Sequence, residues 1–129
     1  MNSKPLQDKC IWIVEDEFLL ALELQMMVQD AGGTVIGPDG NLEAALEKWA
    51  AMERKPDAAV LDVDINGRDV FPVAERVKAA GIPFLFNTGH GDRGELKDRF
   101  GGVTVCIKPT SEDEIMRELA RMVGVEQAD

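Results

Sequence analysis

Cysteine and histidine are scarce in this 129-residue chain, and each shortage excludes a kind of site. The two cysteines, Cys10 and Cys106, both lie inside apolar runs, which is not the pattern of a disulfide framework. With the single histidine His90, the chain also lacks the ligands for a zinc cluster. We therefore expect two buried thiols in a reducing compartment, with no structural disulfide and no structural zinc.

Long apolar runs and basic clusters are missing as well. No apolar run approaches the length that spans a membrane, and the segment from Met1 to Lys9 is too polar for a signal peptide. The formal net charge is −10, from 24 acidic and 14 basic residues, and such a field repels nucleic acid and anionic lipid. We therefore expect a cytoplasmic protein whose partners are neither nucleic acids nor membranes.

The length and composition are those of one globular domain. The chain is close to the commonest domain size, and its hydrophobic fraction of 45% is ordinary. We expect a single domain over residues 1–129, with a core from about 9 to 124 and polar tails at 1–8 and 125–129.

Short apolar runs alternate with longer amphipathic segments along the chain. The runs predict strands at 10–14, 34–37, 58–61, 82–86 and 103–107. Helices are expected at 18–30, after an Asn41 cap, across 70–77, at 95–100 and after a capping box of Ser111 and Glu114. In the first helix we expect a wide apolar face that includes Leu19, Leu22, Met26 and their neighbours.

The alternation of strands and helices predicts an α/β fold with a parallel sheet and right-handed crossovers. Strands that are apolar throughout are typical of a sheet covered on both faces. Five such units favour a five-stranded parallel sheet, a flavodoxin-like (βα)5 three-layer sandwich with strand order 2-1-3-4-5. In that order the first and third strands flank the switch point, where ligands bind beyond the carboxyl ends.

Polar residues follow four of the predicted strands. Glu15 and Asp16 end the first strand, Asp62 the third, Thr88 the fourth and Lys108 the fifth. Parallel strands bring these ends to one edge, where three carboxylates repel one another unless water or a cation lies among them. Oxygen ligands alone suit Mg²⁺, and a lysine with a hydroxyl suits a phosphoryl group. The sequence therefore predicts a site for both.

Four short motifs, in this order, resemble the receiver domain of bacterial response regulators. They are Val-Glu-Asp-Glu at 14–17, Leu-Asp-Val-Asp at 61–64, Asn-Thr-Gly at 87–89 and Ile-Lys-Pro at 107–109. The resemblance covers about residues 9–124. It implies a phosphoprotein of a two-component or phosphorelay pathway that uses Mg²⁺ as its cofactor.

The resemblance also assigns a role to each acid of the site. Asp62 is implied as the phosphoacceptor and as a metal ligand, and Asp16 as the principal metal-binding carboxylate. Glu15 is implied to assist through a metal-bound water, and Asp64 to offer its backbone carbonyl to the metal. The choice of Glu15 and Asp16, over Asp16 and Glu17, rests on this resemblance.

The remaining roles fall at the ends of the fourth and fifth strands. Lys108 is implied to pair with a phosphoryl oxygen, and Pro109 to follow a cis peptide bond that directs Lys108 inward. Thr88 is implied to move and to donate a hydrogen bond to the phosphoryl group. By the physics of phosphoryl transfer, alignment and charge neutralisation are the main requirements, which such a set can meet.

One detail sets the chain apart from ordinary receivers, which carry an aromatic residue three positions before the lysine. Val105 stands there, and the segment Phe86 to Gly89 is similar to the single-domain receivers with a Phe-Ala-Thr-Gly signature, from which Asn87, His90 and Gly91 depart. The usual threonine–aromatic coupling is therefore not expected. We place the moving surface on the segment from Gly89 to Phe100, the fifth strand and the last helix.

The resemblance implies partners rather than a small-molecule substrate. The phosphodonor is expected to be a sensor histidine kinase or a histidine phosphotransfer protein, and the output a change in binding to a downstream protein target. The chain is not expected to be an ordinary enzyme, because its own chemistry is limited to transfer onto itself and slow autodephosphorylation.

Two other functions remain as alternatives. Asp62 and Asp64 also resemble the Asp-x-Asp signature of haloacid-dehalogenase-type phosphatases, in which the first Asp is the nucleophile and the second a general acid. In that family the signature usually closes the first strand and the metal-binding acids follow it, whereas here it closes the third strand and the acids precede it. The second alternative is a docking module that is not phosphorylated.

Overall fold

A computed structural model describes residues 4–89 and 93–124. The main sheet and its helices follow the chain as β1 (Cys10–Val14), α1 (Phe18–Asp30), β2 (Thr34–Asp39), α2 (Leu42–Ala51), β3 (Ala58–Leu61), α3 (Phe71–Ala79), β6 (Phe84–Thr88), α4 (Arg93–Arg99), β7 (Thr104–Ile107) and α5 (Glu112–Met122). A small hairpin, β4 (Asp64–Ile65) and β5 (Arg68–Asp69), follows β3.

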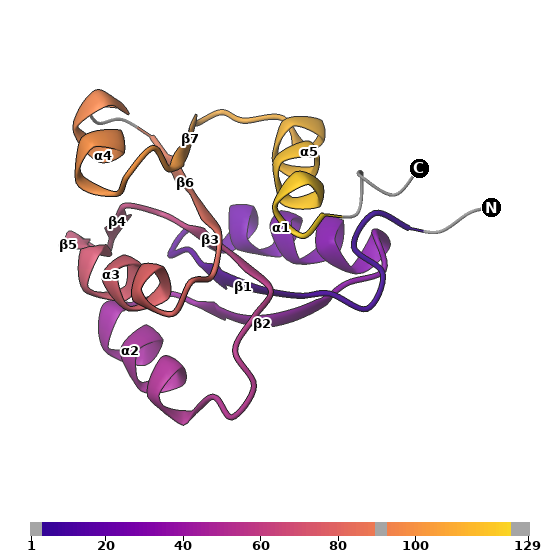
Figure 1. Ribbon diagram of the computed structural model, residues 1–129, viewed down its shortest axis with the longest axis horizontal. Coiled ribbons are helices and arrows are strands. Elements are labelled where there is room, and N and C mark those ends of the chain that lie inside the picture. Colours follow the sequence, from indigo (N-terminus) through magenta and orange to yellow (C-terminus); the bar gives the residue numbers. More distant parts are fainter. Residues whose placement is uncertain (1–3, 90–92, 125–129) are drawn as a thin grey trace.

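The five main strands are parallel and lie in the order β2-β1-β3-β6-β7. This order confirms the predicted 2-1-3-4-5 topology, because β6 and β7 are the fourth and fifth strands of the main sheet. Figure 1 shows α1 and α5 beside each other on one side of the sheet and α2 and α3 on the other. The flavodoxin-like three-layer sandwich is therefore confirmed.

The two faces of the sheet bury two apolar clusters because strand side chains alternate between faces. Trp12 and Val14 of β1 belong to the cluster that includes residues of α2, α3 and α4, whereas Ile11 and Ile13 belong to the cluster on α1 and α5. Trp12 is fully buried and stacks on Trp49, with 5.8 Å between ring centroids. The same alternation sets which side chains at the strand ends point to which face.

Two predicted helix caps are present. The Asn41 side chain accepts a hydrogen bond from Ala44 N at 2.8 Å, and the Ser111 hydroxyl accepts one from Glu114 N at 3.1 Å. Each bond satisfies an amide that the first turn of a helix leaves without a partner. These caps fix where α2 and α5 begin.

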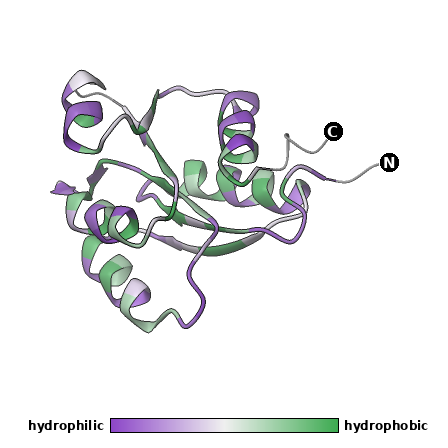
Figure 2. Cartoon of the chain, viewed as in Figure 1, coloured by the Kyte–Doolittle hydropathy of each residue, from purple (hydrophilic) through white to green (hydrophobic). Residues whose placement is uncertain are grey.

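The predicted apolar face of α1 is wrong. Its members are exposed, Leu19 by 66%, Leu22 by 39% and Met26 by 53%, while the residues that face the core are Ala21, Leu24, Met27 and Val28. Figure 2 colours α1 as hydrophobic over much of its length. Because apolar residues occur on more than one side of this helix, spacing alone did not identify the side that packs on the sheet.

Several boundaries also differ from the prediction, and two of the differences bear on the core and the site. Leu6 is fully buried and its amide donates to Ala31 O at 2.9 Å, so the packed region includes residues placed in the polar tail. The fourth strand of the sheet spans Phe84–Thr88 rather than 82–86. This shift brings Asn87 and Thr88 into the strand, where both are buried. Among the helices of the described ranges, none is long and apolar enough to cross a membrane.

Candidate functional site

The acidic cluster forms where β1 and β3 end side by side. Val14 pairs with Leu61 in the parallel register, so Glu15 and Asp62 each stand one residue beyond this pair. Oxygen atoms of Glu15, Asp16 and Asp62 lie within 4.8 Å of one another. The structure therefore brings together the three carboxylates that the sequence placed at one edge.

Lys108 reaches this cluster from the end of β7. Its backbone amide donates to Thr88 O at 2.8 Å, which continues the ladder between β6 and β7. Its Nζ atom lies 3.0 Å from Asp62 Oδ2 and 3.2 Å from Glu15 Oε1. The Lys108–Pro109 peptide bond is cis, as predicted. The ammonium group of Lys108 thus bridges two carboxylates that follow different strands.

Burial governs the protonation of the two bridged acids. Glu15 is 3% exposed, and burial together with the nearby Asp62 charge raises the pKa of Glu15 to about 7. Burial also raises the pKa of Asp62, although Lys108 opposes this shift. Desolvation lowers the pKa of Lys108, but its contacts with Asp62 and Glu15 outweigh it and raise that pKa overall. Both buried acids therefore hold a proton more readily than free carboxylates do.

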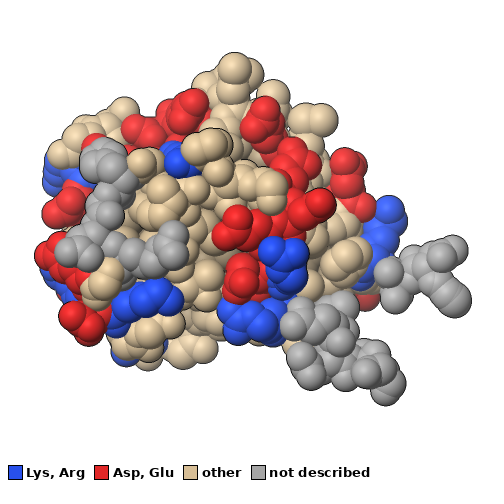
Figure 3. All heavy atoms as spheres, turned by 90° about the horizontal axis from the view of Figure 1, so that it is seen from above, with Lys and Arg blue, Asp and Glu red and all other residues tan. Residues whose placement is uncertain are grey.

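The donor set fits a hard cation that keeps water ligands. All three side chains offer carboxylate oxygen, and Asp16 is exposed on the solvent side. A cleft of about 280 Å³ opens beside Glu15 and Asp16, between the first turns of α1 and Gly40. Acidic side chains also extend over much of the face in Figure 3. The residues present can therefore bind Mg²⁺ and admit a phosphoryl group.

A hairpin turn holds the exposed acid of the cluster. Asn66 N donates to Asp16 Oδ2 at 2.8 Å, and the Asn66 side chain donates to Gly40 O at 3.0 Å. Asp64 Oδ1 accepts from Gly67 N at 2.7 Å within the same turn, so this carboxylate is engaged by the hairpin. An asparagine followed by a glycine, here Asn66-Gly67, is typical of a turn. Its contact with Asp16 depends on how two distant loops meet.

The buried end of β6 places two polar side chains on opposite faces of the sheet. Thr88 is 2% exposed and follows Phe86 on the α3–α4 face, while Asn87 follows Leu85 on the face of α1 and α5. Asn87 Oδ1 accepts from Thr110 Oγ1 at 2.8 Å, and its buried Nδ2 has no partner among the described residues. Asn87 departs from the Phe-Ala-Thr-Gly signature, and the sequence indicated no role for it.

Aromatic residues gather on β6 and beside α4 instead of at Val105. Phe86 pairs in register with the buried Val105, and its ring lies 5.2 Å from Phe100 and 5.4 Å from Phe84 by centroids. His90 and Gly91 lie outside the described residues, as does part of the surface predicted to move. The rings of Phe84, Phe86 and Phe100 pack together in the cluster that includes Val105.

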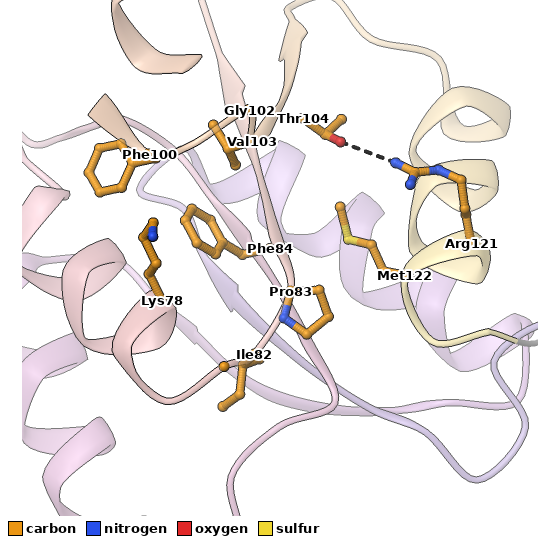
Figure 4. Close-up of a pocket in the computed structure, with 11 residues that line it drawn as sticks. Lys78, Ile82, Pro83, Phe84, Phe100, Gly102, Val103, Thr104, Arg121 and Met122 are labelled. Atoms are coloured by element: carbon orange, nitrogen blue, oxygen red, sulfur yellow. Dashed lines mark hydrogen bonds between the residues drawn. The ribbon is translucent and has the colours of Figure 1, made fainter. Parts of the chain in front are cut away.

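A second hollow lies at the opposite, amino edge of β6 and β7. It measures about 320 Å³ and is bordered by Pro83, Phe84 and Phe100, with Lys78 and Arg121 at its sides (Figure 4). Arg121 donates to Thr104 Oγ1 at 3.2 Å. Among the residues that the structure describes, no acidic side chain lines this hollow, so they offer no carboxylate ligand for a metal ion there.

Comparison with solved structures finds the same architecture in other proteins. SdrG from Sphingomonas melonis Fr1 is 34% identical, with 95% of this chain and 99% of SdrG covered and a TM-score of 0.73. The response regulator PhyR from Brucella abortus is 24% identical over 96% of this chain and 51% of PhyR, with a TM-score of 0.79. The magnesium-bound receiver domain of the sensor histidine kinase PA1611 from Pseudomonas aeruginosa is 20% identical. The match covers 91% of this chain and 98% of that domain, with a TM-score of 0.75.

Curated sequences give a consistent result over part of their length. The sensory transduction protein LytT of Bacillus subtilis is 28% identical over 114 residues, which is 86% of this chain and 46% of LytT. The chain spans about half the length of the curated relatives it matches. No family model matches the chain.

Proposed function

The chain belongs to the receiver domains of response regulators, and from this membership we propose that Asp62 accepts a phosphoryl group in an Mg²⁺-dependent reaction. The observation that supports this role best is the position of Lys108 Nζ, which contacts both Asp62 and Glu15 at the carboxyl edge. A carboxylate nucleophile beside a fixed cation and two further acids has what phosphoryl transfer requires.

Transfer begins with the Asp62 carboxylate, which attacks the phosphorus of a phosphohistidine on the donor protein. The P–N bond breaks, its electron pair returns to the imidazole, and an acyl phosphate forms on Asp62. Lys108 then exchanges its contact with Asp62 for one with a phosphoryl oxygen, which offsets the charge that builds on the transferred group. Thr88, which is buried at the carboxyl end of β6, donates a hydrogen bond from its hydroxyl to the phosphoryl group and serves as the switch residue.

Four residues would hold the metal. Asp16 and Asp62 offer carboxylate oxygens, Glu15 acts through a bound water, and Asp64 offers its backbone carbonyl. Mg²⁺ at this place supplies positive charge against the acids and the transferred phosphoryl group. The magnesium ion in the active-site cleft of the PA1611 receiver domain supports this assignment.

The exposed apolar side chains of α1 suit a protein phosphodonor. Phe18 is 76% exposed, and Phe18 and Leu22 border the cleft that contains Asp16. Leu19 borders a second cleft of about 470 Å³ that contains Lys108. An apolar patch that borders the cleft of Asp16 and the cleft of Lys108 fits a donor that covers α1 while it presents its phosphohistidine. We assign that donor as a histidine kinase or a histidine phosphotransfer protein.

The output is proposed to be a change in protein binding. The acyl phosphate is labile and resets the protein, so the chain carries out self-phosphorylation and slow autodephosphorylation rather than turnover of a substrate. A downstream protein target binds the changed surface, and the pathway lies in the cytoplasm. A phosphatase of the haloacid-dehalogenase type is not favoured, because the Asp64 carboxylate is engaged by Gly67 N in the hairpin.

Intact mass spectrometry tests the proposal. The chain is incubated with acetyl phosphate with and without Mg²⁺, alongside Asp62→Asn. We expect one phosphoryl group that requires Mg²⁺ and is absent from the variant. An unmodified chain that nevertheless binds Mg²⁺ and releases no phosphate from the donor would favour the docking module instead.

A further inference from the structure

We propose that Asn66, at the tip of the β4–β5 hairpin, is the residue that positions Asp16 for Mg²⁺, a role that rests on the metal site proposed above. Asn66 contacts two segments that are distant in sequence. Its amide N–H lies 2.8 Å from Asp16 Oδ2, and its side-chain Nδ2 lies 3.0 Å from Gly40 O. One residue therefore ties the hairpin to the acid and to the connection between β2 and α2.

Asp16 needs such a partner more than the other two acids do. Glu15 and Asp62 are buried and bridged by Lys108, so packing and charge restrict their side chains. Asp16 is less buried than they are, and the contact that holds its carboxylate in the described part of the chain is the Asn66 amide. The bond occupies one carboxylate oxygen and leaves the other to ligate the cation. A carboxylate already held in place loses less freedom when the metal binds.

The connection between β2 and α2, which Asn66 contacts at Gly40, also contacts Glu15. Glu15 N donates to Asp39 O at 3.0 Å, and Gly40, the next residue, accepts from the Asn66 side chain. The end of β2 and the hairpin thus enclose the Glu15–Asp16 pair from two sides. This arrangement couples the placement of both acids to the residue at the hairpin tip.

Asparagine meets two requirements at this position. Its backbone φ is 54°, in the left-handed region that asparagine tolerates better than most residues other than glycine. Gly67 follows with φ of 82°, which completes the two-residue hairpin turn. Glycine at position 66 would keep the backbone shape but lose the bond to Gly40, whereas alanine would lose the bond and strain the turn.

Magnesium titration by calorimetry on the full chain tests the assignment. The variants are Asn66→Gly, Asn66→Ala and the matched control Asn41→Ala, which removes the α2 cap one residue from Gly40 without touching Asp16. We expect Mg²⁺ binding to weaken about threefold in Asn66→Gly and about tenfold in Asn66→Ala. Asn41→Ala should lower the thermal midpoint yet bind Mg²⁺ within about 1.5-fold of the parent chain.

The proposal is overturned if both Asn66 variants bind Mg²⁺ within about twofold of the parent, or if Asn41→Ala weakens binding as much as they do. Circular dichroism establishes that each variant is folded. If Asn66→Ala does not fold, the Mg²⁺ affinity of Asn66→Gly is the deciding measurement. A parent chain that binds no Mg²⁺ would contradict the metal site itself. If the parent chain binds Mg²⁺ and the Asn66 variants bind it equally well, only the role of Asn66 is contradicted.

Discussion

The carboxyl and amino edges of the sheet differ in which side chains they bury and which they expose. Every buried polar or charged residue in the described ranges lies at or directly beyond the carboxyl end of a strand, namely Glu15, Asp39, Asp62, Asn87 and Thr88. Beside them, α1 exposes Phe18 and Leu19. At the amino edge, Phe84 is buried while Lys78 and Arg121 are exposed (Figure 4).

This difference separates the part of the molecule that serves stability from the part that serves function. Buried charge and exposed apolar surface both cost free energy, so a chain shaped for stability alone would keep neither. Both occur together at one edge, and that edge is where the phosphoacceptor is proposed. Departures from ordinary burial are expected at functional sites. The predictions below test this contrast, beginning with the largest expected effect.

The same substitution in α5 and α1 should have very different effects on stability. Leu119 of α5 is fully buried, so Leu119→Ala should lower the free energy of unfolding by about 3 kcal/mol. Leu19 of α1 is 66% exposed, so Leu19→Ala should change it by less than about 0.5 kcal/mol. Urea denaturation measures both. Equal losses would contradict the assignment of Leu19 to a binding surface rather than to the core.

The buried acids should make the metal-free protein less stable as the pH rises. Burial raises the pKa of Glu15 from its ordinary value of 4.5 to about 7 in the folded chain. Between these two pH values the folded state therefore retains a proton that the unfolded state releases. The stability that this proton contributes below pH 4.5 should therefore fall by about 3 kcal/mol as the pH rises to 7. Urea denaturation across this range measures the loss.

Glu15→Gln provides the control for this pH effect, since it removes the titrating group and keeps a similar shape. Its stability should change less over the same range, and saturating Mg²⁺ should reduce the decline in the parent chain. A parent profile that matches that of Glu15→Gln without metal would show that Glu15 titrates normally.

The exposed residues of α1 should matter for one phosphodonor and not for another. The double variant Leu19→Ala and Leu22→Ala should slow phosphoryl transfer from a phosphorylated histidine protein by about tenfold, because part of the docking surface is lost. Its phosphorylation by acetyl phosphate, which needs no docking surface, should match that of the parent. If both donors slow equally, the substitutions alter the site itself.

The smallest effect is expected at Asn87. Its Nδ2 is buried without a partner among the described residues, so Asn87→Ala removes an unfavourable group together with one hydrogen bond. The net change in unfolding free energy should lie within about 1 kcal/mol and favour the variant. Thermal unfolding measures it against Thr110→Val, which should destabilise because Asn87 Oδ1 then loses its donor. A large loss of stability in Asn87→Ala would contradict this account.

The sequence predicted the fold and which polar side chains meet at the carboxyl edge, because each strand is a short apolar run that ends in a polar residue. Parallel pairing then forces Glu15, Asp62 and Lys108 to one edge, whatever the details of packing. The exposed face of α1 was not predicted, because a helix with apolar residues on more than one side offers two faces for the core. The bond between Asn66 and Asp16 was missed because it joins loops that are 50 residues apart in sequence.

The central claim is that Asp62 carries the phosphoryl group, and chemical trapping tests it most directly. Borohydride reduces an acyl phosphate to an alcohol, so the chain is treated with acetyl phosphate and Mg²⁺, reduced, digested and analysed by peptide mass spectrometry. We predict that homoserine replaces aspartate at position 62 and that this product requires Mg²⁺. Reduction at Asp16 or Asp64 with Asp62 intact would contradict the account.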